Sequence, residues 1–243
     1  MPPRLLLVVP CYNEAGRLHP EAFLHLAAAG SEVGLVFVDD GSTDGTAAIL
    51  ADLAARGGAN VTVLTLSRNA GKGEAVRHGI LAALERDPEF VGFWDADLST
   101  PLTALPVFMD VFRTRPGVEI VMGARVKLLG RHVRRSLMRH YCGRVFATAA
   151  SFALGVAVYD TQCGAKIFRV TESIRQLFRE PFQSKWIFDV ELLSRYLAAT
   201  RSEHGESRIC ELPLETWTAV PGSKLTLRHA LRAAWDLVLI ALQ

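Results

Sequence analysis

The sequence predicts an α/β protein with a mostly parallel, Rossmann-like sheet and helices on both of its faces. Two observations point to this class. Short apolar runs of strand length alternate with helical patterns over the first 125 residues, which is typical of consecutive βαβ units. The apolar runs are also nearly continuous, as expected of strands that are covered on both faces of a sheet.

Five strands are expected, at Leu5–Pro10, Val33–Asp39, Val61–Leu66, Phe90–Trp94 and Ile120–Gly123. The helices expected between them are Arg17–Ala29, Gly45–Arg56, Gly73–Arg86 and Thr103–Arg113. Each helical segment is amphipathic or rich in alanine, so one face can cover the sheet. Residues 225–243 also have a helical pattern, and their apolar end is too short to cross a bilayer.

The composition excludes several classes of protein. The chain has 243 residues, and its 27 basic and 25 acidic residues nearly balance, which argues against a nucleic-acid-binding protein. Four scattered cysteines without a CxxC pair favour reduced thiols, and the short apolar run near the N-terminus is no signal peptide. We therefore expect a cytoplasmic protein with one domain over residues 1–243, in two halves of about 1–125 and 126–243.

Acidic side chains follow the expected strands, at the edge where parallel sheets bind their ligands. Asp95 and Asp97 come directly after one strand, and in an extended chain residues two apart point to the same side. Two such carboxylates can share a divalent cation, here Mg²⁺ or Mn²⁺. Asp39 ends another strand, where its carboxylate can accept hydrogen bonds from a base or a ribose.

A glycine-flanked lysine, Lys72, follows the third strand and adds a cation to the same edge. The surrounding residues are no phosphate-binding P-loop, because Leu66 stands where that motif needs glycine and Glu74 where it needs serine or threonine.

The segment between Ile120 and Tyr159 contains no acidic residue but seven arginines and lysines, interleaved with large apolar side chains. A basic amphipathic helix of this kind is typical of a surface for anionic lipid or phosphate. The other interpretation is a solvated helix with one face in the core. The sequence leaves both interpretations open.

Several motifs together resemble those of a known family. They are residues 9–14 (VPCYNE), 38–46 (VDDGSTDGT), 69–77 (NAGKGEAVR), 95–99 (DADLS), 160–168 (DTQCGAKIF), 186–193 (WIFDVELL) and 222–225 (GSKL). In this order they resemble family 2 glycosyltransferases of the GT-A fold, and most closely the dolichyl-phosphate β-glucosyltransferases. The resemblance covers nearly the whole chain.

The resemblance implies a site for a UDP-sugar donor. The donor-binding residues would be Pro10, Tyr12, Glu14, Asp39, Lys72, Asp95, Ala96 and Asp97. Asp95 and Asp97 would form the family's D-x-D metal site, with Asp97 the stronger candidate for a ligand. Ser99 stands where the related dolichyl-phosphate mannosyltransferases have a glutamine that helps to bind the metal.

The resemblance also implies a lipid-phosphate acceptor. Arg125 matches the arginine of the family's G-x-R motif, Arg139 would be a second phosphate-binding arginine, and Lys224 matches the lysine of G-S-K-L. The implied reaction is an inverting, metal-dependent transfer of glucose from UDP-glucose to a polyprenyl phosphate. The protein would be peripheral at the cytoplasmic face of a membrane. A phosphate oxygen is already deprotonated near neutral pH, so positioning and charge neutralisation can suffice for catalysis.

Other functions remain open at this point. A soluble family 2 enzyme with a saccharide or small hydroxyl acceptor would need a general base, for which Asp189 or Asp160 is the candidate. A sugar-nucleotide pyrophosphorylase would need a glycine-rich loop where residues 10–14 stand. A non-catalytic lipid-binding protein would leave the acidic strand ends without a role.

Overall fold

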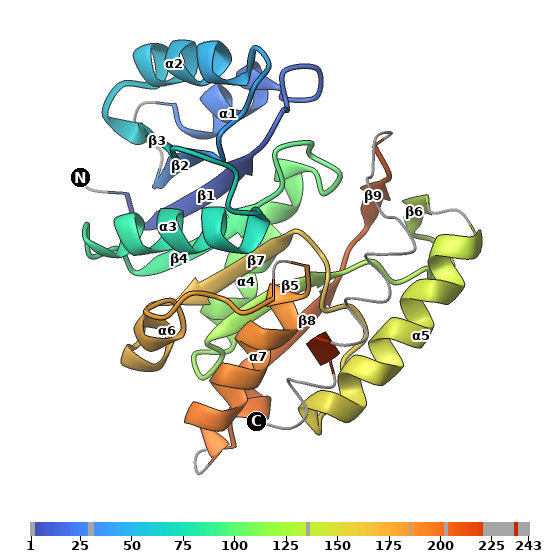
Figure 1. Ribbon diagram of the computed structural model, residues 1–243. Coiled ribbons are helices and arrows are strands. Elements are labelled where there is room, and N and C mark those ends of the chain that lie inside the picture. Colours follow the sequence, from blue (N-terminus) through green and yellow to red (C-terminus); the bar gives the residue numbers. More distant parts are fainter. Residues whose placement is uncertain are drawn as a thin grey trace. The chain divides into compact units, whose positions relative to one another are not determined.

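The computed structural model describes residues 3–28, 32–134, 137–184, 186–201, 204–220 and 236–237. The chain forms two compact units, and neither is continuous in sequence (Figure 1). Unit 1 comprises Met1–Leu98 and Gly164–Pro181, and unit 2 comprises Ser99–Cys163 and Phe182–Gln243. Unit 2 thus begins before residue 125, and a short later segment returns to unit 1.

The sheet of unit 1 has the order β3-β2-β1-β4-β7. Its strands are β1 (Leu5–Cys11), β2 (Val33–Asp39), β3 (Val61–Thr65), β4 (Phe90–Trp94) and β7 (Ala165–Arg169). The first four are parallel, as expected, and every residue of β4 is buried. β7 was not expected as a strand, and it pairs antiparallel with β4. The sheet is therefore mixed, because β7 runs in the opposite direction to its neighbour β4.

Helices cover both faces of this sheet. They are α1 (Pro20–Leu26), α2 (Thr46–Gly57), α3 (Lys72–Leu84) and α6 (Glu172–Leu177), with a 3₁₀ turn η1 (Gly58–Asn60) after α2. α1 and α2 lie on one face and α3 on the other (Figure 1). α3 packs closely because Gly79 faces Val8 of β1, where a Cβ at residue 79 would overlap the valine side chain. α1 is shorter than expected, since proline at its first position sets its beginning.

The described part of unit 2 contains two parallel strand pairs and three α-helices. The strands are β5 (Ile120–Ala124) with β8 (Ile209–Pro213) and β6 (His132–Arg134) with β9 (Thr216–Thr218). The helices are α4 (Leu105–Thr114), α5 (Leu137–Leu154) and α7 (Phe188–Ala199), with 3₁₀ turns η2 (Leu102–Ala104) and η4 (Gly205–Arg208). Ala150 of α5 packs with Ile187, Val190 and Leu237 in a core cluster.

The apolar side chains of the basic segment lie mainly on α5, whereas only two of its seven basic residues, Arg139 and Arg144, belong to this helix. The expected helix over residues 225–243 lies outside the described residues, apart from Asp236 and Leu237. No helix in the described part of the chain is both long enough and apolar enough to span a bilayer.

Candidate active site

The carboxyl ends of β1, β2 and β4 meet at one edge of unit 1, because these strands are parallel neighbours. Cys11 at the end of β1 pairs in register with Asp39 at the end of β2. Three of the donor-binding residues expected from the sequence lie at these strand ends: Pro10 within β1, Tyr12 in the loop after it and Ala96 in the loop after β4. Tyr12 is exposed and Ala96 is buried.

The loop after β1 is cross-linked to the loop after β2. Asn13 donates its backbone N–H to Ser42 Oγ over 3.0 Å, and its side-chain oxygen accepts the Thr43 N–H over 2.8 Å. Glu14 donates its N–H to Thr46 Oγ1 over 2.8 Å. These bonds hold the two loops in one conformation, so Tyr12 and Glu14 are positioned without a ligand.

Two buried aspartates follow β2 and have different partners. Asp39 Oδ1 accepts the Ser42 N–H over 2.9 Å, which closes the turn after the strand. Asp40 accepts the N–H groups of Ala70 and Gly71 over 2.7 and 2.9 Å, so it holds the loop that leads into α3. The sequence pattern points to Asp39 and indicates no role for Asp40. The contact joins the loop after β2 to the loop before α3, so no local sequence pattern indicates it.

Lys72 is the first residue of α3, and its Nζ lies 2.5 Å from Asp95 Oδ1. Both side chains remain about one-third exposed, at 39% and 32%. The lysine and the D-x-D segment expected from the sequence are therefore in direct contact. The ion pair reduces the repulsion between Asp95 and Asp97.

Gly164 fixes the position of Asp95. The Asp95 N–H donates to the Gly164 carbonyl over 2.9 Å. A Cβ built at residue 164 would overlap both carboxylate oxygens of Asp95. Only glycine at residue 164 lets the carboxylate take this position. This contact explains why the motif has glycine there.

Glu14 faces the same acidic segment. Burial raises the pKa of the Glu14 carboxyl above its ordinary value; Arg17 opposes this shift, and the charges of Asp97 and Asp95 add to it. One oxygen of Glu14 accepts from Arg17 over 2.6 Å, while Oε2 is buried with no hydrogen-bond partner in the described part of the chain. An unpaired buried acceptor beside two aspartates suits a ligand that brings hydroxyl donors or a cation.

The side chains at this edge offer some of the ligands that a hard divalent cation needs. Asp95 and Asp97 offer carboxylate oxygens, which such ions prefer. Among the described residues, no group of three or more histidine, cysteine, aspartate or glutamate side chains is placed to hold a metal ion. A cation held here would therefore take its remaining ligands from water or from substrate phosphates, as Mg²⁺ usually does.

In unit 2, Arg125 follows β5 and is bound by Asp160. Asp160 accepts from the Arg125 backbone N–H, Nε and Nη2 over 2.9, 2.6 and 2.7 Å. The guanidinium also lies 5.4 Å from the Trp217 ring. Because its carboxylate is engaged in this bidentate pair, Asp160 is a poor general base.

Glu211 of β8 holds the backbone just before the Asp160 side chain. Its carboxylate accepts the N–H groups of Tyr159 and Asp160 over 2.8–2.9 Å. Arg144 of α5 lies 3.9 Å over the Tyr159 ring. The Nη1 atom of Arg144 and the Nε2 atom of Gln162 are buried without a hydrogen-bond partner among the described residues. These donors are suited to an anionic group that the protein itself does not supply.

Asp189 and Glu191 lie in the first turn of α7, and both are buried. Glu191 accepts the N–H groups of Gln183 and Ser184 over 3.1 and 3.0 Å and pairs with Arg195 over 2.6 Å. It therefore shapes the loop before the helix. The role of Asp189 toward an acceptor stays a prediction.

Two expected phosphate-binding residues are not placed by the structure. Arg139 lies on α5, but its side chain is outside the described residues, and Lys224 is outside them altogether. Their roles stay predictions.

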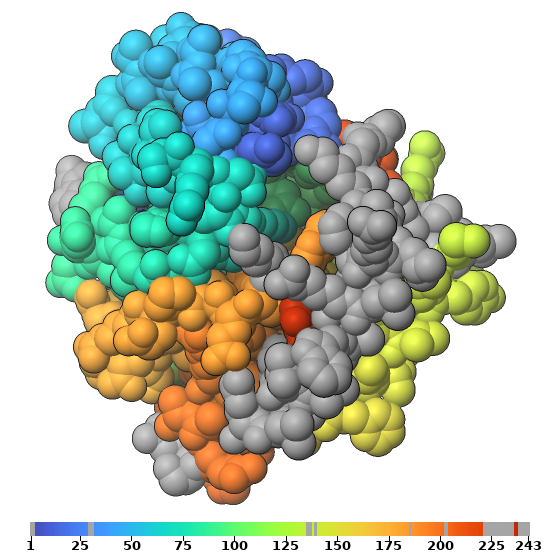
Figure 2. Space-filling model, in the orientation of Figure 1, coloured from blue at the N-terminus to red at the C-terminus, as the bar shows by residue number. Residues whose placement is uncertain are grey.

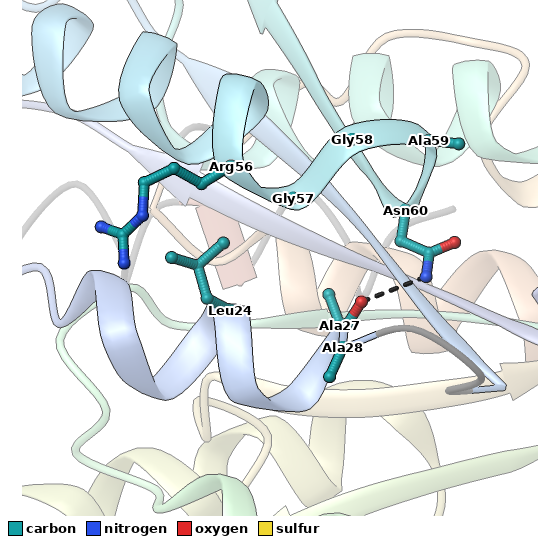
Figure 3. A pocket seen from close by; sticks show the side chains of 8 residues that line it. All are labelled: Leu24, Ala27, Ala28, Arg56, Gly57, Gly58, Ala59 and Asn60. Carbon is teal, nitrogen blue, oxygen red and sulfur yellow. Dashed lines mark hydrogen bonds between the residues drawn. The ribbon is translucent and has the colours of Figure 1, made fainter.

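A shallow groove elsewhere on unit 1 is distinct from this site. It is lined by the C-terminal ends of α1 and α2 and by η1, where Asn60 donates to the Ala27 carbonyl over 3.1 Å (Figure 3). It lies at the amino end of β3, away from the carboxyl ends of the strands. Its lining offers one charged side chain, Arg56, and carries no chemistry that we can assign.

A family model described as glycosyl transferase family 2 matches residues 6–177. Dolichyl-phosphate beta-glucosyltransferase ALG5C of Trichomonas vaginalis is 31% identical over 97% of this chain and 70% of its own length. The dolichyl-phosphate beta-glucosyltransferase of Drosophila melanogaster is 34% identical over 91% of this chain and 69% of its own length.

Solved structures resemble the chain in fold. Glucosyl-3-phosphoglycerate synthase from Mycobacterium tuberculosis, crystallised with Mn²⁺, UDP-glucose and glycerol 3-phosphate, matches with a TM-score of 0.67 and 21% identity. The match covers 99% of this chain and 79% of the other. At this identity the likeness concerns the fold, and it confirms the architecture expected from the sequence.

Proposed function

Because the chain belongs to glycosyltransferase family 2 and has the GT-A fold, we propose that it transfers glucose from UDP-glucose to a polyprenyl phosphate of the dolichyl type. The reaction would invert the anomeric carbon and give a β-linked lipid-phosphate sugar and UDP. We further propose that the protein acts peripherally at the cytoplasmic face of a membrane. The named relatives support the sugar and the acceptor class.

The observation that carries the proposal is the carboxyl edge of unit 1. Lys72, Asp95 and Asp97 come from two different loops, and the ion pair and the Gly164 contact hold Asp95 in place. Glu14 and Asp39 lie on neighbouring loops, where their oxygens can accept hydroxyl donors such as those of a ribose. This combination of hard oxygen donors and one cation suits a nucleoside diphosphate that carries its own metal ion.

In the proposed reaction, a phosphate oxygen of the acceptor attacks the anomeric carbon while the bond from that carbon to the UDP oxygen breaks. The electron pair of the broken bond leaves with UDP. Asp95 and Asp97 would hold Mg²⁺ or Mn²⁺, which neutralises charge on the departing diphosphate. Lys72 contributes a fixed positive charge to the same unit, and the cross-linked loops with Tyr12 and Glu14 hold the nucleoside in one orientation.

Unit 2 supplies donors for the acceptor's phosphate. Arg125 presents a guanidinium whose orientation is set by Asp160, and a fixed fork suits phosphate oxygens. The buried donors of Arg144 and Gln162, which lack partners in the described part of the chain, add to this anion-binding character. Arg139 and Lys224 are proposed as further phosphate ligands on the strength of the family resemblance.

One assay tests the proposed function. Purified protein is incubated with Mn²⁺, a panel of radiolabelled nucleotide sugars and short polyprenyl phosphates, and the lipid is then extracted. Label is expected in the lipid with UDP-glucose, and it should vanish when a chelator removes the metal. Label entering the lipid from another sugar nucleotide would correct the donor, and label found only on water-soluble hydroxyl compounds would overturn the acceptor.

The variant Asp189→Asn separates the proposed acceptor from a hydroxyl acceptor. A lipid phosphate needs no strong base, so turnover should fall only a few-fold, whereas a loss of about 100-fold or more would indicate general-base catalysis. Glu191→Gln is no suitable control, because Glu191 holds the loop before α7. The exposed Glu180→Gln serves instead.

A further inference from the structure

We propose that helix α5 lies flat on the surface of an anionic lipid bilayer and inserts an apolar stripe into it. The α5 stripe consists of Met138, Tyr141, Val145 and Phe152. The inference rests on the proposed function, because a lipid-linked acceptor has to be reached at a membrane. It goes further by naming the surface that makes the contact and the kind of lipid that the surface prefers.

The four side chains are large, apolar and highly exposed, at 77%, 66%, 73% and 84% of their accessible surface. Their spacings of three, four and seven residues place them on one side of the helix. Between Val145 and Phe152 the same side carries the exposed Ala149, so no charge interrupts the stripe. Figure 2 shows side chains of this helix, coloured yellow-green to yellow, at the surface of unit 2.

The opposite side of α5 already packs against the protein. Ala147 and Ala150 are buried, and Phe146, Ala153 and Leu154 contact the cluster that contains Ile187 and Val190 of the α7 region. A helix with one buried face normally presents charged residues on the other. Here the outer face is apolar as well, which marks an interaction surface. A single exposed valine such as Val107 on α4, near Asp110 and Arg113, is by contrast ordinary.

The charge of the surrounding segment indicates an anionic partner. No acidic residue occurs between Ile120 and Tyr159, and Lys127 and Arg134 are exposed just before α5. Leu128 and Leu129 in the same loop are also exposed, at 49% and 105%. Exposed cations that precede a one-sided apolar stripe, in a segment without acidic residues, favour a helix that lies in the interface plane and is attracted by anionic headgroups.

The geometry also determines how the helix meets the lipid. α5 has 18 residues, but its inner face is occupied by protein side chains, so lipid can reach only one side of it. The structure therefore favours insertion to the depth of the stripe over a membrane crossing. On this proposal the inner face of α5 packs in the protein core and the outer face contacts lipid.

The test is flotation of the full chain with vesicles. Vesicles of phosphatidylcholine with phosphatidylglycerol are compared with vesicles of phosphatidylcholine alone, at low and high salt. The full chain should float with the anionic vesicles, and less so at high salt, because screening weakens the attraction. The variant with all four stripe residues changed to serine should bind on the order of tenfold or more weakly, since less apolar area is buried. Val107→Ser is the matched control and should float like the wild type.

Activity separates this inference from the proposed function. With a short polyprenyl phosphate dissolved in detergent, the stripe variant should transfer glucose like the wild type; with acceptor in vesicles it should be slower. Equal flotation of the variant and the wild type would overturn the membrane surface and leave the proposed function intact. A wild-type dimer in light scattering that the stripe variant abolishes would overturn it as well, because the stripe would then bind a second copy. Absence of transfer in detergent by the wild type would instead contradict the proposed function.

Discussion

The two units illustrate different ways of building polar sites. In unit 1 the candidate residues lie at or after the ends of parallel strands, and backbone hydrogen bonds hold most of them, beside the one side-chain pair of Lys72 with Asp95. In unit 2 the candidate arginine, Arg125, is held by Asp160, whose backbone is in turn held by Glu211. The first arrangement follows from strand order, whereas the second depends on side-chain pairs far apart in sequence. Substitutions in the two units should therefore have different consequences.

The largest effect is expected from Asp97→Ala in unit 1. Removal of the stronger candidate ligand should reduce turnover by about 1000-fold, because metal neutralisation of the leaving group is worth several kcal/mol. UDP binding measured by calorimetry should also lose its dependence on Mn²⁺. The exposed Asp110→Asn of α4 is the control. Retention of metal-dependent UDP binding by Asp97→Ala would contradict the assigned role.

Gly164→Ala should have the next largest effect. The added methyl group would overlap the Asp95 carboxylate and push it from its place beside Lys72. We expect turnover to fall by about 100-fold, with a cost of 1–3 kcal/mol in stability from overpacking. Gly16→Ala is the matched control, because a Cβ at residue 16 meets nothing nearby. If Gly164→Ala lost only stability while kcat and the affinity for UDP stayed unchanged, the positioning role would be wrong.

Glu211→Gln tests the network of unit 2. The amide keeps the size of the side chain but offers one carbonyl acceptor where the carboxylate has two oxygens bound to N–H groups. The KM for the acceptor should rise about tenfold, and the affinity for UDP should not change, since charged hydrogen bonds contribute roughly 1.5–3 kcal/mol. Glu215→Gln in the same unit provides the control. A rise in the KM for the donor instead would contradict the proposal that this network serves the acceptor.

The smallest effect concerns Glu14. Its raised pKa means that the folded protein holds a proton more tightly than the unfolded chain, so its contribution to stability is lost as pH rises through the unfolded and then the folded pKa. Glu14→Gln should therefore stabilise the protein by roughly 0.5–1 kcal/mol at pH 7 and by less at pH 4. Urea unfolding at both pH values measures this. If Glu85→Gln, at an exposed position, raised the free energy of unfolding by a similar amount, the burial of Glu14 would not explain the gain.

Much of unit 1 was predictable from the sequence for a physical reason. Four of its strands are apolar runs bounded by polar loops, and strands that follow one another in the chain, β1 with β2 and β2 with β3, are neighbours in the sheet. The segment 165–169 was missed as a strand because it is short and carries Lys166 and Arg169. Its place beside β4 depends on a long-range pairing that no local pattern reveals.

The candidate site was predictable to a similar extent. Asp95, Asp97 and Lys72 were found because strand ends are where parallel sheets place ligands. Asp40 and Glu211 were missed, since what gives each a role is the set of N–H groups that it binds. No spacing in the sequence indicates such contacts.

The position of β7 has a consequence for how the chain folds during synthesis. The first 98 residues leave the ribosome with the β4 edge still unpaired, and the strand that covers this edge follows some 70 residues later. An open edge of buried, apolar residues is a template for association with other chains. Truncated forms that end before residue 165 should thus aggregate, and nascent chains should depend on chaperones until β7 emerges.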